Sequence, residues 1–202
     1  MNKKVLFGCG GVLAVALIVG VMLVMWGVGI YNNLVTMDEQ VTSSWSQVEN
    51  QYQRRTDLIP NLVNTVKGVA AFEKETFTAV TEARSRVNQI NVSSDILNDP
   101  NAFRQFQSAQ DGLSSALSRL LITVEKYPEL KANENFLQLQ AQLEGTENRI
   151  SVERKKFNES VQTYNTTRRR FPANFIAGIA GFGEKQYFQA VEGSDVAPKV
   201  EF

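Results

Sequence analysis

The sequence contains no histidine and a single cysteine, Cys9, and these two scarcities exclude several classes of enzyme. Zinc, copper and iron sites that combine imidazole or thiolate ligands cannot be built within one such chain. Hydrolases that depend on a histidine base are excluded for the same reason. A lone cysteine also cannot form an intrachain disulfide. We therefore predict no catalytic residue, no metal site and no cofactor, and an enzyme ranks last among the functions considered.

Net charge is also lacking, because the 202 residues carry 21 basic and 21 acidic side chains. A balanced chain has no overall positive field with which to attract nucleic acid. The sequence shows no strand-like alternation, so no glycine-rich phosphate loop follows a strand. Nucleic acid is therefore not an expected partner.

A long uncharged stretch, from Val5 to Ile30, is present at the start of the chain. Roughly 20 apolar residues suffice for a helix to cross the hydrocarbon core, so the stretch predicts a transmembrane anchor over residues 1–30. A cleaved signal peptide is the alternative, but its apolar region would run only about 7 to 15 residues. A lipoprotein signal at Cys9 is disfavoured, because the apolar residues should precede the cysteine rather than follow it.

Charges on the two sides of this anchor predict its orientation. Lys3 and Lys4 precede it, whereas acidic residues follow it and the first basic residue on that side is Arg54. Positively charged flanks favour the cytoplasmic side. The N-terminus is therefore expected in the cytoplasm, with the soluble domain on the extracytoplasmic side.

Beyond the anchor, apolar residues recur at steps of three and four, which is typical of helices with one buried face. Such helices can bury their apolar faces only against each other. We therefore predict an all-α protein in which the transmembrane helix is followed by an up-and-down antiparallel helical bundle with long, coiled-coil-like helices. The bundle occupies residues 31–171, with helices over about 31–91, 99–127 and 133–171.

Local signals refine these helices. Pro60 lacks an N–H and clashes with the preceding turn, so it should kink the first helix or divide it. A kink is favoured because the apolar stripe resumes in phase. Asp99 and Asn133 are expected to cap the other two helices. Residues 172–202 form a tail that is rich in glycine and aromatic residues near its start.

Polar residues interrupt the apolar stripes of the first and third predicted helices. Opposite charges on adjacent helices fix register and pairing, so we expect an interhelix polar layer. The alternative is a metal or acid–base site, but di-iron bundles also need Glu-x-x-His motifs, which this chain cannot supply. The candidates for the layer are Arg55, Asp57, Asn61, Glu144, Glu147, Arg154 and Asn158.

A second set of candidates lies at the end of the third helix and in the tail. Three consecutive arginines there complement the helix dipole, and the alternative is that they bind lipid phosphates. The apolar tail is expected to cap the bundle, or else to enter a bilayer or a neighbouring subunit. The candidate lipid or partner contacts are Arg168, Arg169, Arg170, Phe175 and Phe182.

A series of short motifs spans nearly the whole chain. In order, they include Ile30-Tyr31-Asn32-Asn33-Leu34-Val35, Asp57-Leu58-Ile59-Pro60-Asn61-Leu62-Val63, Tyr127-Pro128-Glu129-Leu130-Lys131-Ala132, Glu147-Asn148-Arg149-Ile150, Phe171-Pro172 and Gly181-Phe182. In these motifs the chain resembles the LemA family of bacterial membrane proteins. The resemblance implies a transmembrane helix with an antiparallel helical bundle in the bacterial plasma (inner) membrane, and no established enzymatic activity.

One position departs from the family pattern. Many members look to carry a histidine just before the glutamate that here is Glu73, whereas this chain has Phe72. A mechanism that depends on that histidine cannot operate here. The family also includes a magnetosome-associated relative linked to membrane shaping, and members whose genes neighbour a membrane protease.

Two functions follow from these observations. The first is a non-enzymatic, membrane-anchored scaffold that self-associates into a homo-oligomer and organises or shapes the membrane. Its motivation is that a helix over 31–91 would be longer than its neighbours can cover, which leaves an apolar stripe for another copy. The alternative is an adaptor or regulator of another envelope protein, such as a membrane protease.

Overall fold

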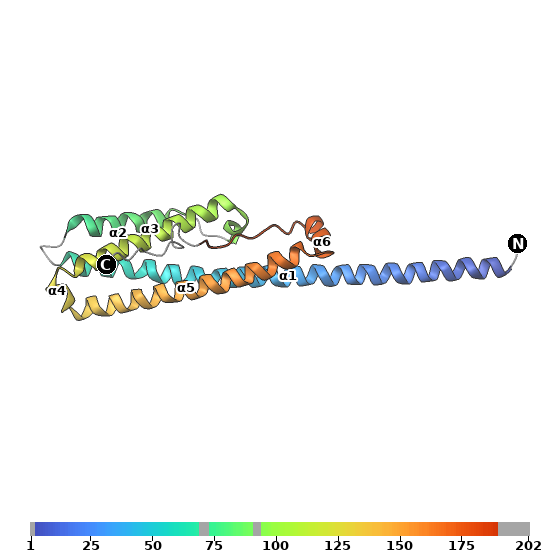
Figure 1. Ribbon diagram of the computed structural model, residues 1–202, viewed down its shortest axis with the longest axis horizontal. Coiled ribbons are helices and arrows are strands. Elements are labelled where there is room, and N and C mark those ends of the chain that lie inside the picture. The colour runs from blue at the N-terminus through green and yellow to red at the C-terminus, as the bar shows by residue number, and fades with distance from the viewer. Residues whose placement is uncertain (1–2, 69–72, 91–93, 190–202) are drawn as a thin grey trace, which may run out of the picture.

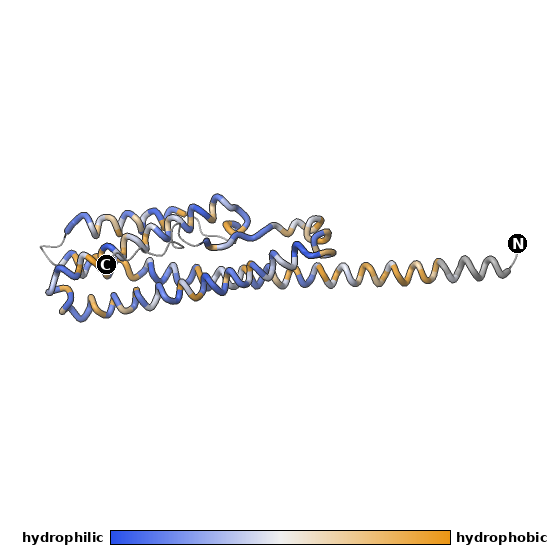
Figure 2. Tube along the Cα trace, in the orientation of Figure 1, coloured by the Kyte–Doolittle hydropathy of each residue, from blue (hydrophilic) through white to orange (hydrophobic). Residues whose placement is uncertain are grey.

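One helix, α1 (Lys3–Lys67), dominates the computed structural model of this protein, which describes residues 3–68, 73–90 and 94–189. At about 1.5 Å per residue, 65 residues of helix extend for roughly 100 Å. Figure 1 shows the N-terminal part of α1 projecting alone from the bundle, and Figure 2 shows that the coloured portion of this part is largely apolar. It is the one helix among the described residues that is long and apolar enough to cross a membrane.

Four helices form the bundle, and no strand occurs in the described parts of the chain. Figure 1 shows α1 and α3 running in one direction and α2 and α5 in the other, so the bundle is antiparallel. The main contacts pair α1 with α5 and α2 with α3. The predicted all-α bundle behind an apolar N-terminal helix is therefore confirmed. The helices after α1 are α2 (Lys74–Asn88), the short 3-10 helix η1 (Ser94–Asn98), α3 (Pro100–Val124), α4 (Pro128–Lys131), α5 (Glu134–Arg169) and α6 (Ala173–Ala180).

The predicted single helix over 31–91 is wrong, because the chain reverses between α1 and α2. The interruption comes after Lys67 and not at Pro60, which lies inside α1. Periodicity reports which residues face a core, but it does not report whether the helix that carries them is continuous. Val80 and Val87 of α2 lie in the same core as Val66 of α1, although α2 runs antiparallel to α1.

Pro60 is accommodated by a contact from α2. A proline has no N–H to donate to the carbonyl four residues earlier, which here belongs to Thr56. Nε of Arg84, on α2, donates to that carbonyl at 3.2 Å. The carbonyl of Thr56, which Pro60 leaves without a donor, thus forms a hydrogen bond between α1 and α2.

The predicted starts of the second and third soluble helices are confirmed by their caps. The side chain of Asp99 accepts from the backbone N–H groups of Asn101 and Ala102 at the start of α3. The side chain of Asn133 accepts from the N–H of Phe136 at the start of α5. An N-cap is readable from sequence because it depends on a few adjacent residues.

The buried residues form two cores along the length of the bundle. The aromatic core, nearer the membrane span, has Trp45 within 6.0 Å, centroid to centroid, of four phenylalanine rings from three other segments, namely Phe103, Phe106, Phe157 and Phe188. The distal core lies at the other end and contains Ile59, Leu62, Val66, Val80, Leu113, Leu117, Leu120, Phe136 and Leu143, among others.

These cores correct the argument that the first helix leaves an apolar stripe uncovered. The stripe positions Val41, Val48 and Leu62 on α1 are each 0% exposed, because residues of α3 and α5 share their cores and α2 joins them around Leu62. Among the side chains of α1 that the structure describes, the exposed large apolar ones lie from Leu13 to Tyr31, in the projecting segment.

The contact between Arg84 and the carbonyl of Thr56 predicts a non-additive pair of substitutions. Arg84→Ala should lower the free energy of unfolding by about 1–2 kcal/mol, because it leaves the carbonyl without a donor. In a Pro60→Ala background the loss should be smaller, since the restored N–H of residue 60 satisfies the same carbonyl. Urea unfolding of the full chain in detergent measures both, and equal losses in the two backgrounds would contradict this account.

Candidate functional site

A buried arginine joins three helices at one level of the bundle. Arg55 on α1 is 1% exposed. Its Nη1 donates to Glu147 of α5 at 2.7 Å and to Ser114 of α3 at 2.6 Å. Its Nη2 donates to the backbone and side-chain oxygens of Gln110, also on α3. We call these four residues the polar layer.

The polar layer fits a structural role. A guanidinium offers five donors in a planar fork, so it can serve partners on two neighbouring helices at once. Glu147 is 38% exposed, and water therefore reaches the carboxylate while the guanidinium stays buried. Arg55 also lies 5.1 Å from the ring centroid of Tyr52. The layer therefore links α1, α3 and α5 at one level of the bundle.

Three of the predicted members do not join the layer, and this corrects the prediction for them. Asp57 is exposed and accepts from Gln53 on its own helix at 2.8 Å. Glu144 is exposed and accepts from Gln140, also within its own helix, at 2.9 Å. Asn61 is exposed on α1. Asp57, two residues from Arg55, lies on nearly the opposite face of α1, and Asn61 and Glu144 are likewise turned far enough from the layer to be exposed.

The remaining two candidates hold the C-terminal strap, which we define as residues 182–189. The side chain of Asn158 pairs with the backbone of Phe188 in both directions, each bond being 3.0 Å. Arg154 lies 4.4 Å from the ring centroid of Phe188 and 3.5 Å from the carboxylate of Asp111 on α3. These residues therefore link α5 to the strap and to α3.

Two further amides bind the strap in the same manner. Asn165 exchanges two hydrogen bonds with the backbone of Lys185, at 2.9 and 3.1 Å. Gln107 on α3 exchanges two with the backbone of Gln189, at 2.9 and 3.2 Å. Each side chain supplies one donor and one acceptor, as a neighbouring strand would. The strap has no strand partner among the described residues, so side-chain amides hydrogen-bond the backbone N–H and C=O groups of Lys185, Phe188 and Gln189.

The spacing of the amides matches the extended strap. Asn158 and Asn165 are seven residues apart on a helix, which corresponds to a rise of roughly 10 Å. Phe188 and Lys185 are three residues apart, which corresponds to roughly 10 Å of extended chain. The strap therefore runs antiparallel to α5, as Figure 1 shows. This Asn-x6-Asn spacing is the one signal in the sequence that could have predicted the strap.

Lys185 anchors the strap at its centre. Its side chain is 8% exposed, and Nζ lies 2.8 Å from Asp38 of α1 and 3.0 Å from the side-chain oxygen of Asn98. Tyr164 lies beside it, with Nζ 5.7 Å from the ring centroid, and donates its hydroxyl to the carbonyl of Gly183 at 2.9 Å. Sequence reasoning missed Lys185, because its partners come from distant parts of the chain.

The arginine run at the end of α5 also meets the strap. Nε of Arg168 donates to the carbonyl of Phe182 at 2.7 Å, and Arg169 pairs with Glu184. Arg170 is exposed. Phe182 is half-buried with its ring 5.7 Å from that of Tyr31, whereas Phe175 on α6 is 64% exposed. Two of the three arginines therefore hold the chain's own backbone and a carboxylate.

The buried tyrosines of this region are poor groups for proton transfer. Burial raises the pKa of Tyr52 to about 12. Burial, and then the charge of Asp38, raise the pKa of Tyr164 to about 12. Both hydroxyls stay protonated at neutral pH. Among the described residues, no group of three histidine, cysteine, aspartate or glutamate side chains could hold a metal ion.

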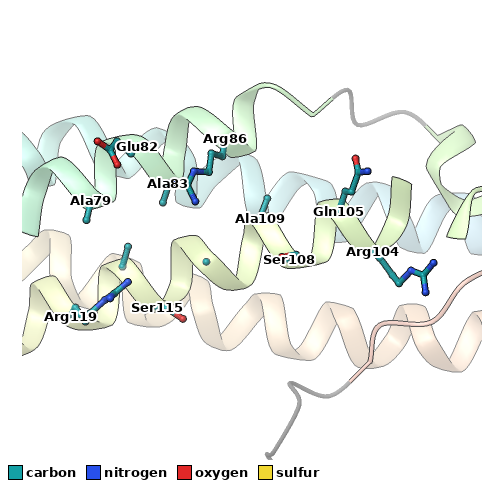
Figure 3. Close-up of a pocket in the computed structure, with 12 residues that line it drawn as sticks. Ala79, Glu82, Ala83, Arg86, Arg104, Gln105, Ser108, Ala109, Ser115 and Arg119 are labelled. Carbon is teal, nitrogen blue, oxygen red and sulfur yellow. The ribbon is translucent and has the colours of Figure 1, made fainter. Parts of the chain in front are cut away.

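A groove runs between α2 and α3 (Figure 3). It has a volume of about 580 Å³, and small residues such as Ala83, Ser108 and Gly112 line it. Its charged residues are Glu82, Arg86, Arg104 and Arg119. The groove is open to solvent, and three of its four charged residues are arginines.

The polar layer predicts unequal effects for two neighbouring glutamates of α5. Glu147→Ala should lower the free energy of unfolding by about 1–2 kcal/mol, because it leaves the buried Arg55 charge without its carboxylate. Glu144→Ala is the matched control and should change it by less than about 0.5 kcal/mol. Chemical unfolding of the full chain measures both, and equal effects would show that the layer is unimportant.

The amide contacts predict local release of the strap. Asn158→Ala and Asn165→Ala should each speed hydrogen exchange at the backbone N–H of the residue they hold, Phe188 or Lys185, because that N–H loses its acceptor. Asn148→Ala, at an exposed asparagine of the same helix, is the control. Exchange rates in the strap that stay at the control value would contradict the assignment.

Comparison with known proteins agrees with this architecture. The model of the LemA family matches residues 44–202. The chain is 30% identical to magnetosome protein MamQ 2 of Paramagnetospirillum magneticum and to magnetosome protein MamQ of Magnetospirillum gryphiswaldense, over 82% of this chain and 66% of each relative. It is 25% identical to protein LemA of Metamycoplasma hominis, over 82% of this chain and 71% of that one.

The chain thus spans slightly less than two thirds of the MamQ proteins it matches. The family match covers the strap and every described helix that follows α1, together with α1 from residue 44 onward. Because the family match covers most of the sequence, the chain belongs to the LemA family.

Proposed function

We propose that this protein is a non-enzymatic, membrane-anchored scaffold that self-associates and organises or shapes the membrane. It would lie in the bacterial plasma (inner) membrane with its bundle on the extracytoplasmic side, because Lys3 and Lys4 precede the span and acidic residues follow it. Relatives that are named as magnetosome proteins are consistent with a role at a shaped membrane.

The observation that carries this proposal is the continuity of α1. The helix runs without interruption from Lys3, through the exposed apolar segment, to Lys67 at the far end of the bundle. A flexible linker would allow the bundle to tilt independently of the span. Without one, the orientation of the bundle and that of the span are coupled, so contacts between bundles impose an arrangement on the spans in the bilayer.

Self-association needs a contact surface, and the soluble stripe of α1 does not provide it. The span offers an alternative in Ala16 and Gly20, which are four residues apart and therefore lie on one face. A Cβ added at Gly20 would meet nothing within 4 Å, so this face is open. Small residues at this spacing allow two transmembrane helices to approach closely.

A second function, an adaptor for another envelope protein such as a membrane protease, is favoured by the groove between α2 and α3. Arg86, Arg104 and Arg119 border it, and none of the three pairs with a carboxylate among the described residues. The adaptor would bind an acidic segment there. Arg86→Glu with Arg104→Glu should then abolish capture of one dominant partner while self-association survives.

Self-association is tested by cross-linking and native mass spectrometry of the full chain in lipid nanodiscs. We expect oligomers in the wild type, and Gly20→Ile should weaken them by about tenfold in dissociation constant, because the added side chain separates the helices. Met22→Ile, on the opposite face of the span, is the matched control. A wild-type protein that stays monomeric at membrane-like density would refute self-association.

A further inference from the structure

Outside the span, three highly exposed large apolar side chains of the described residues lie close together in one row. They are Phe171 at 78%, Phe175 at 64% and Ile179 at 89% exposure. Phe175 and Ile179 are four residues apart and therefore lie on one side of α6, and Phe171, just before the helix, joins them through its ring, whose centroid is 6.0 Å from that of Phe175. Other exposed apolar residues of the bundle, such as Ile122 on α3, are isolated along their helices.

The other side of α6 holds it against the end of the span. Ala173 and Ala177 are buried, and Ile176 lies over Gly27, with its Cδ1 3.8 Å from where a Cβ would stand. The residue after α6, Gly181, has φ of 77°, a conformation that glycine adopts readily, and the chain then turns so that Phe182 meets Tyr31. Figure 2 shows α6 as an apolar segment beside the apolar part of α1.

We infer that α6 is an interfacial lipid-binding helix, whose row of Phe171, Phe175 and Ile179 inserts into the membrane surface at the point where α1 leaves it. The position of α6 indicates that lipid covers this row of side chains. Because Ile176 contacts Gly27 near the end of the uncharged stretch, α6 lies at the level where headgroups surround α1. Helices with one apolar face bind such surfaces with that face roughly 5–10 Å into the headgroup and acyl boundary.

The size of the row argues against a protein partner. A stable protein interface buries roughly 800 Å² on each side, whereas three large side chains contribute at most about 150–250 Å² each. Insertion into a bilayer requires no minimum buried area, because the span already holds the protein in the bilayer. Arg170 is exposed at the start of this segment, whereas Arg168 and Arg169 are engaged by the strap.

This inference goes beyond the proposed function and does not depend on self-association. A lone helix through a bilayer can tilt and rotate freely. A second, lateral insertion beside it fixes both motions, and it places extra volume in one leaflet only. The inserted row thereby gives a single copy of the protein a direct effect on the surrounding lipid.

The test places a fluorescent NBD group at single cysteines in a Cys9→Ala background, with one full-length copy per phosphatidylcholine–phosphatidylglycerol nanodisc. Phe175→Cys and Ile179→Cys report on the row. Ile122→Cys, equally exposed on α3 but near the far end of the bundle, is the matched control. All three positions are on the surface, and unchanged thermal melting by circular dichroism verifies folding.

We expect blue-shifted NBD emission at positions 175 and 179, with severalfold stronger quenching by lipids spin-labelled near the headgroup than by those labelled at the chain end. Position 122 should report water and show no lipid quenching. Water-like emission at 175 and 179 would overturn the inference. Shielding from water without quenching by either lipid would also overturn it, because a protein surface would then cover the row. Loss of oligomers in the Gly20→Ile variant leaves these readings unchanged.

Discussion

A helix that crosses lipid must satisfy all of its backbone hydrogen bonds internally. In this protein the same continuous helix extends beyond the apolar segment, and the rest of the structure is built on it. α1 leaves the apolar region and continues as a helix to Lys67, where it provides the central element of both cores. The other helices are arranged around a rod whose direction is set by the span. A bundle that is built in this way needs no separate device to orient it.

The sequence predicts those features that depend on neighbouring residues. The caps at Asp99 and Asn133, the uncharged span and the helical periodicity each need only a short window, and each was found where expected. The reversal after Lys67 was missed because the apolar stripe continues in phase through it. Pro60 was expected to kink the first helix or divide it, with a kink favoured; the helix continues through it, and an arginine from α2 fills the acceptor that it leaves.

The polar contacts were harder to predict than the helices, because they depend on which helices are neighbours. Arg55 and Glu147 could be named as polar interruptions of apolar stripes, and the structure places them 2.7 Å apart. Gln110 and Ser114 could not be named, since only the tertiary arrangement turns that side of α3 toward Arg55. The same holds for Lys185, whose partners Asp38 and Asn98 lie far from it in sequence.

The strap also has a consequence for the order in which the protein is completed. Phe188 is a member of the aromatic core and closes it beside Trp45, yet it belongs to the last described segment of the chain. A ribosome makes α1 first and the strap much later, so Trp45 has no ring stacked on that side while α2, α3 and α5 are being synthesised. The nascent protein therefore holds an unfilled aromatic site in the half of the bundle nearer the span, and it reaches its final packing only when its own C-terminal segment arrives.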